Sequence, residues 1–126
     1  MKKKVVATDR APEAIGPYSQ AVSTGDVVYC SGQVPLEPVS GELIEGAIGQ
    51  QTRRCLENLG EVLQAAGTSF DRVVKVTAYL VDMGDFPEFN EAYGDFFTTD
   101  PPARATVGVA ALPKGARVEV DCIALA

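Results

Sequence analysis

Residues 73–97 read VVKVTAYLVDMGDFPEFNEAYGDFF, a run that places a strand directly before a helix. Val73 to Val81 is β-branched and apolar with a single charge, which predicts a central strand buried on both faces. Asp85 then opens a helix, since Glu88 follows three residues later in a variant of the capping box and Pro87 fits the first turn. The helix carries an aromatic stripe that is predicted to be core: Phe86, Phe89, Tyr93, Phe96 and Phe97.

On the N-terminal side, Ala47 to Ala66 has apolar residues at spacings of three and four, which predicts an amphipathic helix that ends at Gly67. Further upstream, Gly25-Asp26 separates two apolar runs and predicts a hairpin. The remaining segments are a short strand at Lys4–Thr8, the hairpin strands Tyr18–Thr24 and Val27–Ser31, and an extended loop at Gln33–Glu45.

On the C-terminal side, two strands are predicted, Arg104–Ala110 and Arg117–Leu125, joined by a turn around Pro113. Side chains alternate along a strand, so Val118, Val120 and Cys122 should share the face that the helices cover. We expect the hairpin to carry a polar opposite face made of Arg104, Thr106, Glu119 and Asp121.

The order of elements predicts an α+β fold in a single domain over residues 1–126, with two helices on one face of a sheet. Val28 and Leu80 have no evident cover in this arrangement. A symmetric oligomer is therefore expected, although the sequence by itself does not give the number of subunits.

The composition excludes several classes of function. The 126 residues hold 11 Lys and Arg against 17 Asp and Glu, a net charge of −6, which disfavours binding to nucleic acid or anionic membranes. There is no His, which excludes Ser-His-Asp and Cys-His systems and His-ligated metals. No metal-ligand spacing or phosphate-binding glycine loop is present, so neither a metal nor a cofactor is expected.

Three cysteines, Cys30, Cys55 and Cys122, lie far apart among apolar neighbours. This pattern is typical of small buried hydrophobic residues in a reducing compartment. No apolar stretch has the length of a membrane span and no signal-peptide core follows the first lysines, so a cytoplasmic location is expected.

Two charged residues are the main candidates for chemistry. Arg104 follows Pro101-Pro102, and its guanidinium can grip a carboxylate through two hydrogen bonds. Glu119 can orient a water or take its proton. Each also has a structural reading, Arg104 in a surface ion pair and Glu119 as a solvated strand residue or a partner for Arg117. Three further polar residues are candidates, Tyr18, Ser31 and Asn90, but they are equally plausible as polar groups of a turn, a strand or a helix. Taken singly, each is more typical of a structural than of a catalytic residue.

Several motifs in order resemble one family along nearly the whole chain. The segments that carry the resemblance are AIGPYSQA at 14–21, SGQVP at 31–35, Asn58-Leu59 with AAG at 65–67, FNE at 89–91, PARAT at 102–106, and LPK at 112–114 followed by VEV at 118–120. This pattern is similar to the Rid (reactive intermediate deaminase) family, also called YjgF or L-PSP, and within it to the RidA branch.

The resemblance implies a chorismate-mutase-like subunit in a homotrimer, with active sites in clefts between subunits. It also implies cofactor-independent hydrolysis of enamines and imines, such as 2-aminoacrylate and 2-iminopropanoate, to 2-keto acids and ammonia. In that reading Arg104 binds the substrate carboxylate, while Glu119 and the backbone carbonyl of Thr106 hold the attacking water. Many family members have Cys where this chain has Thr106. The residues expected to line the cleft are Tyr18, Ser31, Gly32 and Asn90.

Two other functions stay open at this point. An endoribonuclease or translation-inhibitor role is attached to some relatives, but the negative charge and the missing His speak against it. A non-catalytic protein that binds small carboxylates would need Arg104 but not Glu119. The deaminase reading needs both residues.

Overall fold

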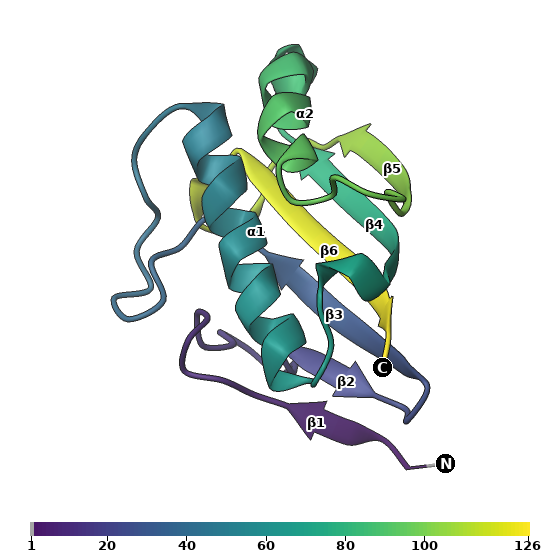
Figure 1. The fold of residues 1–126 in the computed structure, drawn as a ribbon. Helices are drawn as coiled ribbons and strands as arrows, with labels where there is room; N and C mark the ends of the chain where they lie inside the picture. The colour runs from purple at the N-terminus through teal and green to yellow at the C-terminus, as the bar shows by residue number, and fades with distance from the viewer. Residues whose placement is uncertain (1) are drawn as a thin grey trace.

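In a computed structural model that describes residues 2–126, one six-stranded sheet is covered on one face by two helices (Figure 1). The strand order is β1-β2-β3-β6-β4-β5, and every neighbouring pair is antiparallel except β4 and β5, which are parallel. The strands are β1 (Lys4–Val6), β2 (Ala21–Ser23), β3 (Val27–Gln33), β4 (Val73–Leu80), β5 (Ala103–Gly108) and β6 (Val118–Leu125). The helices are α1 (Ile48–Ala65), α2 (Phe86–Gly94) and three short 3₁₀ turns, η1 (Phe70–Arg72), η2 (Met83–Asp85) and η3 (Pro113–Gly115).

The predicted α+β architecture is confirmed, with α1 ending within one residue of its expected boundary. The hairpin around Gly25-Asp26 is also confirmed, because β2 and β3 pair antiparallel across it. The loop after β3 is less extended than predicted, since Leu36 and Leu43 form a bridge that folds it back on itself. No helix among the described residues is long and apolar enough to cross a bilayer.

The predicted hairpin of the last two strands is wrong. β6 lies between β3 and β4, while β5 forms the sheet edge, parallel to β4. β6 buries four side chains on one face: Val118, Val120, Cys122 and Ala124. A central position in the sheet therefore stabilises this strand most, because its whole apolar face is removed from water there. β5 is shorter and partly exposed along its length, which suits an edge strand.

The burial predicted for the strands also needs correction. β4 is buried on one face only, where Val76, Ala78 and Leu80 lie under the helices. Val28 and Leu80, which the sequence left without cover, are fully buried in that same core. The apolar side chains that remain exposed on the open face of the sheet include Tyr29, Val107 and Leu125.

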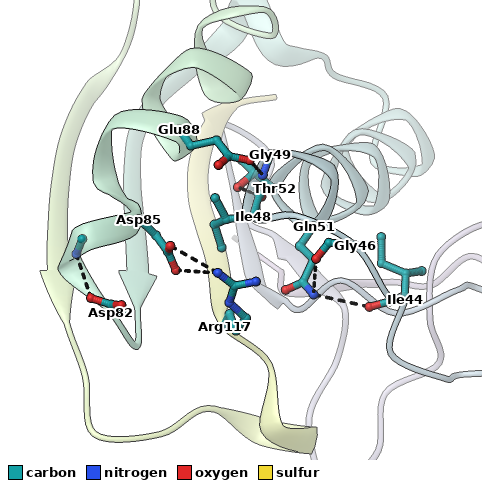
Figure 2. A network of polar contacts seen from close by, with 11 residues as sticks. Ile44, Gly46, Ile48, Gly49, Gln51, Thr52, Asp82, Asp85, Glu88 and Arg117 are labelled. Atoms are coloured by element: carbon teal, nitrogen blue, oxygen red, sulfur yellow. Dashed lines mark hydrogen bonds and ion pairs between the residues drawn. The ribbon is translucent and has the colours of Figure 1, made fainter.

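Polar contacts fix α2 against its neighbours (Figure 2). The predicted capping box is not formed, because Asp85 makes no cap hydrogen bond and its carboxylate instead pairs with Arg117 at 3.1 Å. Glu88 accepts a hydrogen bond of 2.9 Å from the backbone nitrogen of Gly49, in the first turn of α1. These two contacts tie the start of α2 to the beginnings of β6 and α1, so the helix has a defined position over the sheet.

A glycine in the middle of α1 is explained by an aromatic ring. A Cβ built on Gly60 would lie 2.8 Å from a ring carbon of Phe70. That ring is itself held edge-on between Phe96 and Phe97, with centroid distances of 5.6 and 5.4 Å. The glycine therefore allows close packing between α1 and the aromatic cluster after α2.

Candidate functional site

Arg104 lies on the helix-covered side of the sheet, at its edge. It pairs in register with Val76 of β4, which is fully buried under the helices. Its guanidinium carbon lies 4.7 Å from the ring centroid of Tyr93, 5.6 Å from that of Phe86 and 5.7 Å from that of Phe89. Within residues 2–126, no carboxylate lies within 4.0 Å of the guanidinium. The charge of Arg104 is thus stacked on aromatic faces and is not neutralised.

Asn90 and Thr106 lie close to this arginine in the fold. Thr106 pairs with Ala78, so it shares the helix-covered face with Arg104, and Asn90 stands on α2 between Phe89 and Tyr93. The Oδ1 atom of Asn90 and the Oγ1 atom of Thr106 are buried and make no hydrogen bond to other described residues. Buried polar atoms normally have partners, so this region has unused hydrogen-bonding capacity.

Glu119 lies on the open face of the sheet, against Gly32. It pairs in register with Tyr79, whose other neighbour is Val107 on the open face of β5. A Cβ built on Gly32 would lie 2.1 Å from Glu119 Oε2. The register between β3 and β6 shifts at this point, between Cys30 and Gln33. Gly32 therefore leaves room for the carboxylate where the ladder is irregular.

Tyr18 and Ser31 belong to the same region as Glu119. A hollow of about 60 Å³ is lined by residues that include Tyr18, Gly32, Pro113 and Glu119. The Tyr18 hydroxyl accepts a hydrogen bond of 3.3 Å from the Ile15 nitrogen, and its side chain is about half exposed. The Ser31 hydroxyl donates to the carbonyl of Ser19 at 2.6 Å, so its proton is already used within the chain.

The structure therefore separates the predicted site into two groups. Arg104, Thr106 and Asn90 form one group, which we call the arginine half-site; Glu119, Gly32, Tyr18 and Ser31 form the other, the glutamate half-site. Arg104 and Glu119 point to opposite faces of the sheet and stand on strands separated by β4. Two strand spacings amount to about 10 Å, too far for both groups to contact one small substrate.

The shared polar face that the sequence predicted for Arg104, Thr106, Glu119 and Asp121 is thus wrong. The reason is the strand pairing: β5 takes its faces from β4 in a parallel ladder, not from β6 in a hairpin. Glu119 and Asp121 do share the open face, where Asp121 accepts a hydrogen bond of 2.9 Å from the Tyr79 hydroxyl.

The environment of Glu119 raises the pKa of its carboxyl. Burial is the main cause, and the negative charge of Asp121 adds to it. Within one chain Arg104 lies on the other face, so its positive charge is not placed beside Glu119 to favour the ionised form of that carboxyl. A carboxylate with a raised pKa is a stronger proton acceptor, which suits a group that takes a proton from water.

Sequence reasoning missed the aromatic surroundings of Arg104. It assigned Phe86, Phe89 and Tyr93 to the core, and Phe89 and Tyr93 are indeed buried, yet all three rings also face the guanidinium. Their spacing along one helix face was visible in the sequence, but the parallel pairing of β5 with β4, which places Arg104 on the helix-covered face, was not. Among the residues that the structure describes, no cluster of three or more His, Cys, Asp or Glu side chains could hold a metal ion.

Comparisons with known proteins agree on one family. The model of the family described as Endoribonuclease L-PSP matches residues 8–126. A 2-iminobutanoate/2-iminopropanoate deaminase from Mus musculus is 51% identical over 123 residues, which cover 98% of this chain and 91% of the relative.

Solved structures of two similar proteins also superpose closely on this chain. RidA from the Antarctic bacterium Psychrobacter sp. has a TM-score of 0.94 at 43% identity, covering 98% of this chain and 99% of that one. TdcF from E. coli, solved with bound serine, has a TM-score of 0.93 at 40% identity, and the match covers 98% of both chains.

Proposed function

Because this chain belongs to the endoribonuclease L-PSP family, also known as the Rid family, we propose that it is a cofactor-independent deaminase of small 2-imino acids. Its substrates would be 2-iminopropanoate and 2-iminobutanoate, formed from enamines such as 2-aminoacrylate, and its products 2-keto acids and ammonia. The names of several relatives at 46–51% identity support this reading. The single observation that carries it here is an arginine beside unpartnered polar atoms, with its charge left free for a carboxylate.

We propose further that the active site forms between two copies of the chain, in a homotrimer. The arginine half-site would come from one subunit and the glutamate half-site from the next, because Arg104 and Glu119 point to opposite faces within one chain. The exposed apolar residues on the open face, Tyr29, Val107 and Leu125, are suited to cover by another subunit.

In the proposed reaction Arg104 binds the carboxylate of the imino acid and fixes the position of its C=N carbon. Glu119 accepts a proton from water as the water oxygen bonds to that carbon and the C=N electrons move to nitrogen. Glu119 gives this proton to the nitrogen, which forms a carbinolamine. The hydroxyl proton of the carbinolamine then passes through Glu119 to the same nitrogen, so the C–N bond breaks, ammonia leaves and a C=O bond forms. The backbone carbonyl of Thr106 would hold the water, and Asn90, Tyr18, Ser31 and Gly32 would line the cleft. An imine carbon is already electrophilic, so orientation and a proton acceptor are sufficient.

The alternative functions make different demands on the chain. RNA cleavage would require a positively charged surface, whereas the chain has a net charge of −6. A protein that only captures small carboxylates would need the arginine half-site and could dispense with Glu119. The two half-sites therefore distinguish the deaminase from the binding protein.

The test is a coupled assay that generates 2-iminopropanoate in situ and follows keto-acid release. We expect wild-type protein to accelerate release, Arg104→Ala to lose the acceleration, and Glu119→Gln to slow it by about 10²- to 10⁴-fold. Equal rates for wild-type protein and the blank would refute the proposal. Full activity of Glu119→Gln with loss in Arg104→Ala would leave a carboxylate site whose proton acceptor is another group.

A further inference from the structure

Three aromatic rings surround the guanidinium of Arg104, and none of them belongs to the residues assigned so far to substrate or water. Tyr93 is the nearest at 4.7 Å from its ring centroid, and Phe86 and Phe89 follow at 5.6 and 5.7 Å. All three stand on α2, one helical turn apart. We call Phe86, Phe89 and Tyr93 the aromatic cradle.

The cradle rings are themselves held in place by packing. Tyr93 stacks on Phe89 with a centroid distance of 5.5 Å and on Phe97 at 4.6 Å. Phe89 is fully buried and Tyr93 is 6% exposed. The start of α2 is fixed by the contacts of Asp85 with Arg117 and of Glu88 with Gly49 (Figure 2). The rings thus present a rigid surface to a side chain that is otherwise flexible.

The guanidinium of an arginine can be held in place by a carboxylate or by aromatic rings, and the two kinds of partner leave different numbers of its N–H donors free. A carboxylate partner would fix the guanidinium but occupy the fork of N–H donors that a substrate carboxylate needs. Aromatic faces attract the cation without accepting those N–H groups. Burial raises the pKa of the Tyr93 phenol. The positive charge of Arg104 lowers that pKa, as does the approach of its N–H groups to the phenol oxygen, which agrees with close contact between the two side chains.

We propose that Tyr93 and Phe86 are positioning residues: they hold Arg104 by cation–π contact, so that its hydrogen-bond donors are oriented and unoccupied when a small carboxylate arrives. The Tyr93 hydroxyl is buried near the guanidinium but has no partner at hydrogen-bond geometry among the described residues, so we assign the role to the rings. This inference rests on the proposed deaminase function, since it assigns Arg104 as the carboxylate anchor.

The first test compares Phe86→Leu with Phe96→Leu. Both rings are partly buried beside the same core, but Phe96 packs on Phe70 and is not among the three rings that face Arg104. We expect Phe86→Leu to raise KM for the imine about five- to tenfold with kcat within about twofold, because carboxylate binding weakens while water delivery is unchanged. Phe96→Leu should leave KM unchanged. Equal effects of the two substitutions would overturn the proposal.

The second test examines Tyr93. Tyr93→Leu should raise KM at least as much as Phe86→Leu, and Tyr93→Phe, which restores the ring, should bring KM back to within about twofold of wild type. Wild-type KM in a folded Tyr93→Leu variant, or failure of Tyr93→Phe to rescue, would contradict a role for the ring. Thermal unfolding of each variant separates these outcomes from a loss of fold.

A third measurement does not depend on catalysis. The Arg104 Nε–H resonance, identified by its absence in Arg104→Lys, should be shifted by the ring currents in wild-type protein. In Phe86→Leu the chemical shift of this resonance should move toward that of exposed arginines. Titration with pyruvate should shift the resonance at a lower pyruvate concentration in wild-type protein than in Phe86→Leu. A wild-type protein with no deaminase activity but with this signature would refute the proposed function alone. An unshifted resonance in wild type would refute the cradle.

Discussion

Two inactive variants should restore each other when they are mixed. Arg104→Ala removes the arginine half-site and Glu119→Gln disables the glutamate half-site, while each leaves the other half intact. Since the two residues point to opposite faces and lie two strands apart, one chain does not place both on the same small substrate. Under the proposed function, a productive site therefore needs Arg104 from one chain and Glu119 from another.

The expected recovery follows from random assembly. In a 1:1 mixture, a site is functional when its arginine comes from a Glu119→Gln chain and its glutamate from an Arg104→Ala chain. Each of these two conditions is met with a probability of about one half, so about a quarter of all sites recover activity. The same fraction holds for a dimer or a trimer. The result is therefore independent of the number of subunits.

The assay is imine hydrolysis after the two variants have been unfolded together in urea and refolded, with each variant refolded alone as a baseline. A matched control mixes wild type with the double variant in equal amounts. Exchange between chains should lower the activity of that mixture from about a half to about a quarter of wild type. Light scattering before and after mixing establishes that both variants still assemble.

Baseline activity in the mixed variants, together with half activity in the control, would place both functional groups within one chain. That result would refute the argument from strand register. A recovery well above a quarter would mean that the variants assort by preference and that the interface discriminates between them.

Three further outcomes are expected. Gly32→Ala should leave the fold intact but reduce imine hydrolysis at least tenfold, because a Cβ there would displace the Glu119 carboxylate from a position 2.1 Å away; an active variant would show that this position is unimportant. Gly60→Ala should lower the free energy of unfolding by about 1–3 kcal/mol through its clash with Phe70, whereas Gly94→Ala, with open space at its Cβ, should cost nothing in the same urea titration. Glu119→Gln should be more stable than wild type at pH 7, because burial raises the pKa of that carboxyl and its ionised form therefore weakens the folded state. The gain should disappear below about pH 4, where the carboxyl is protonated in both states, and a variant less stable than wild type at pH 7 would contradict the argument.

The elements of this fold could be predicted because their signals are local. The three- and four-residue spacing along α1, the Gly25-Asp26 turn and the alternation along β6 each depend on a few neighbouring residues. Strand pairing depends on competition between distant segments. β6 pairs with β3 and β4 and not with β5, because burial of its apolar face stabilises the fold more in the centre of the sheet. This comparison cannot be made from either strand alone.

The same difference limits prediction of the site. Arg104 and Glu119 stood out as candidates by residue type and surroundings, but the face on which each lies follows from the partner strand. The alternation of side chains was predicted correctly within each strand. It did not show which faces of two strands coincide, because pairing with β4 sets the face on which Arg104 lies. The close fit of Gly32 to the Glu119 side chain and the stacking of Tyr93 on Arg104 arise from contacts between remote segments, for which the sequence carries no periodic signal.

The three cysteines lead to a practical consequence for labelling. Cys30, Cys55 and Cys122 are free and buried. The pKa of Cys55 is raised by burial, and that of Cys122 by a hydrogen bond with Cys30 and by burial. Maleimides react with thiolates, so the native sulfurs should stay largely unmodified in folded protein near neutral pH. A cysteine introduced at the exposed Glu91 would then accept one fluorophore per chain, and energy transfer between donor- and acceptor-labelled batches would report how fast subunits exchange.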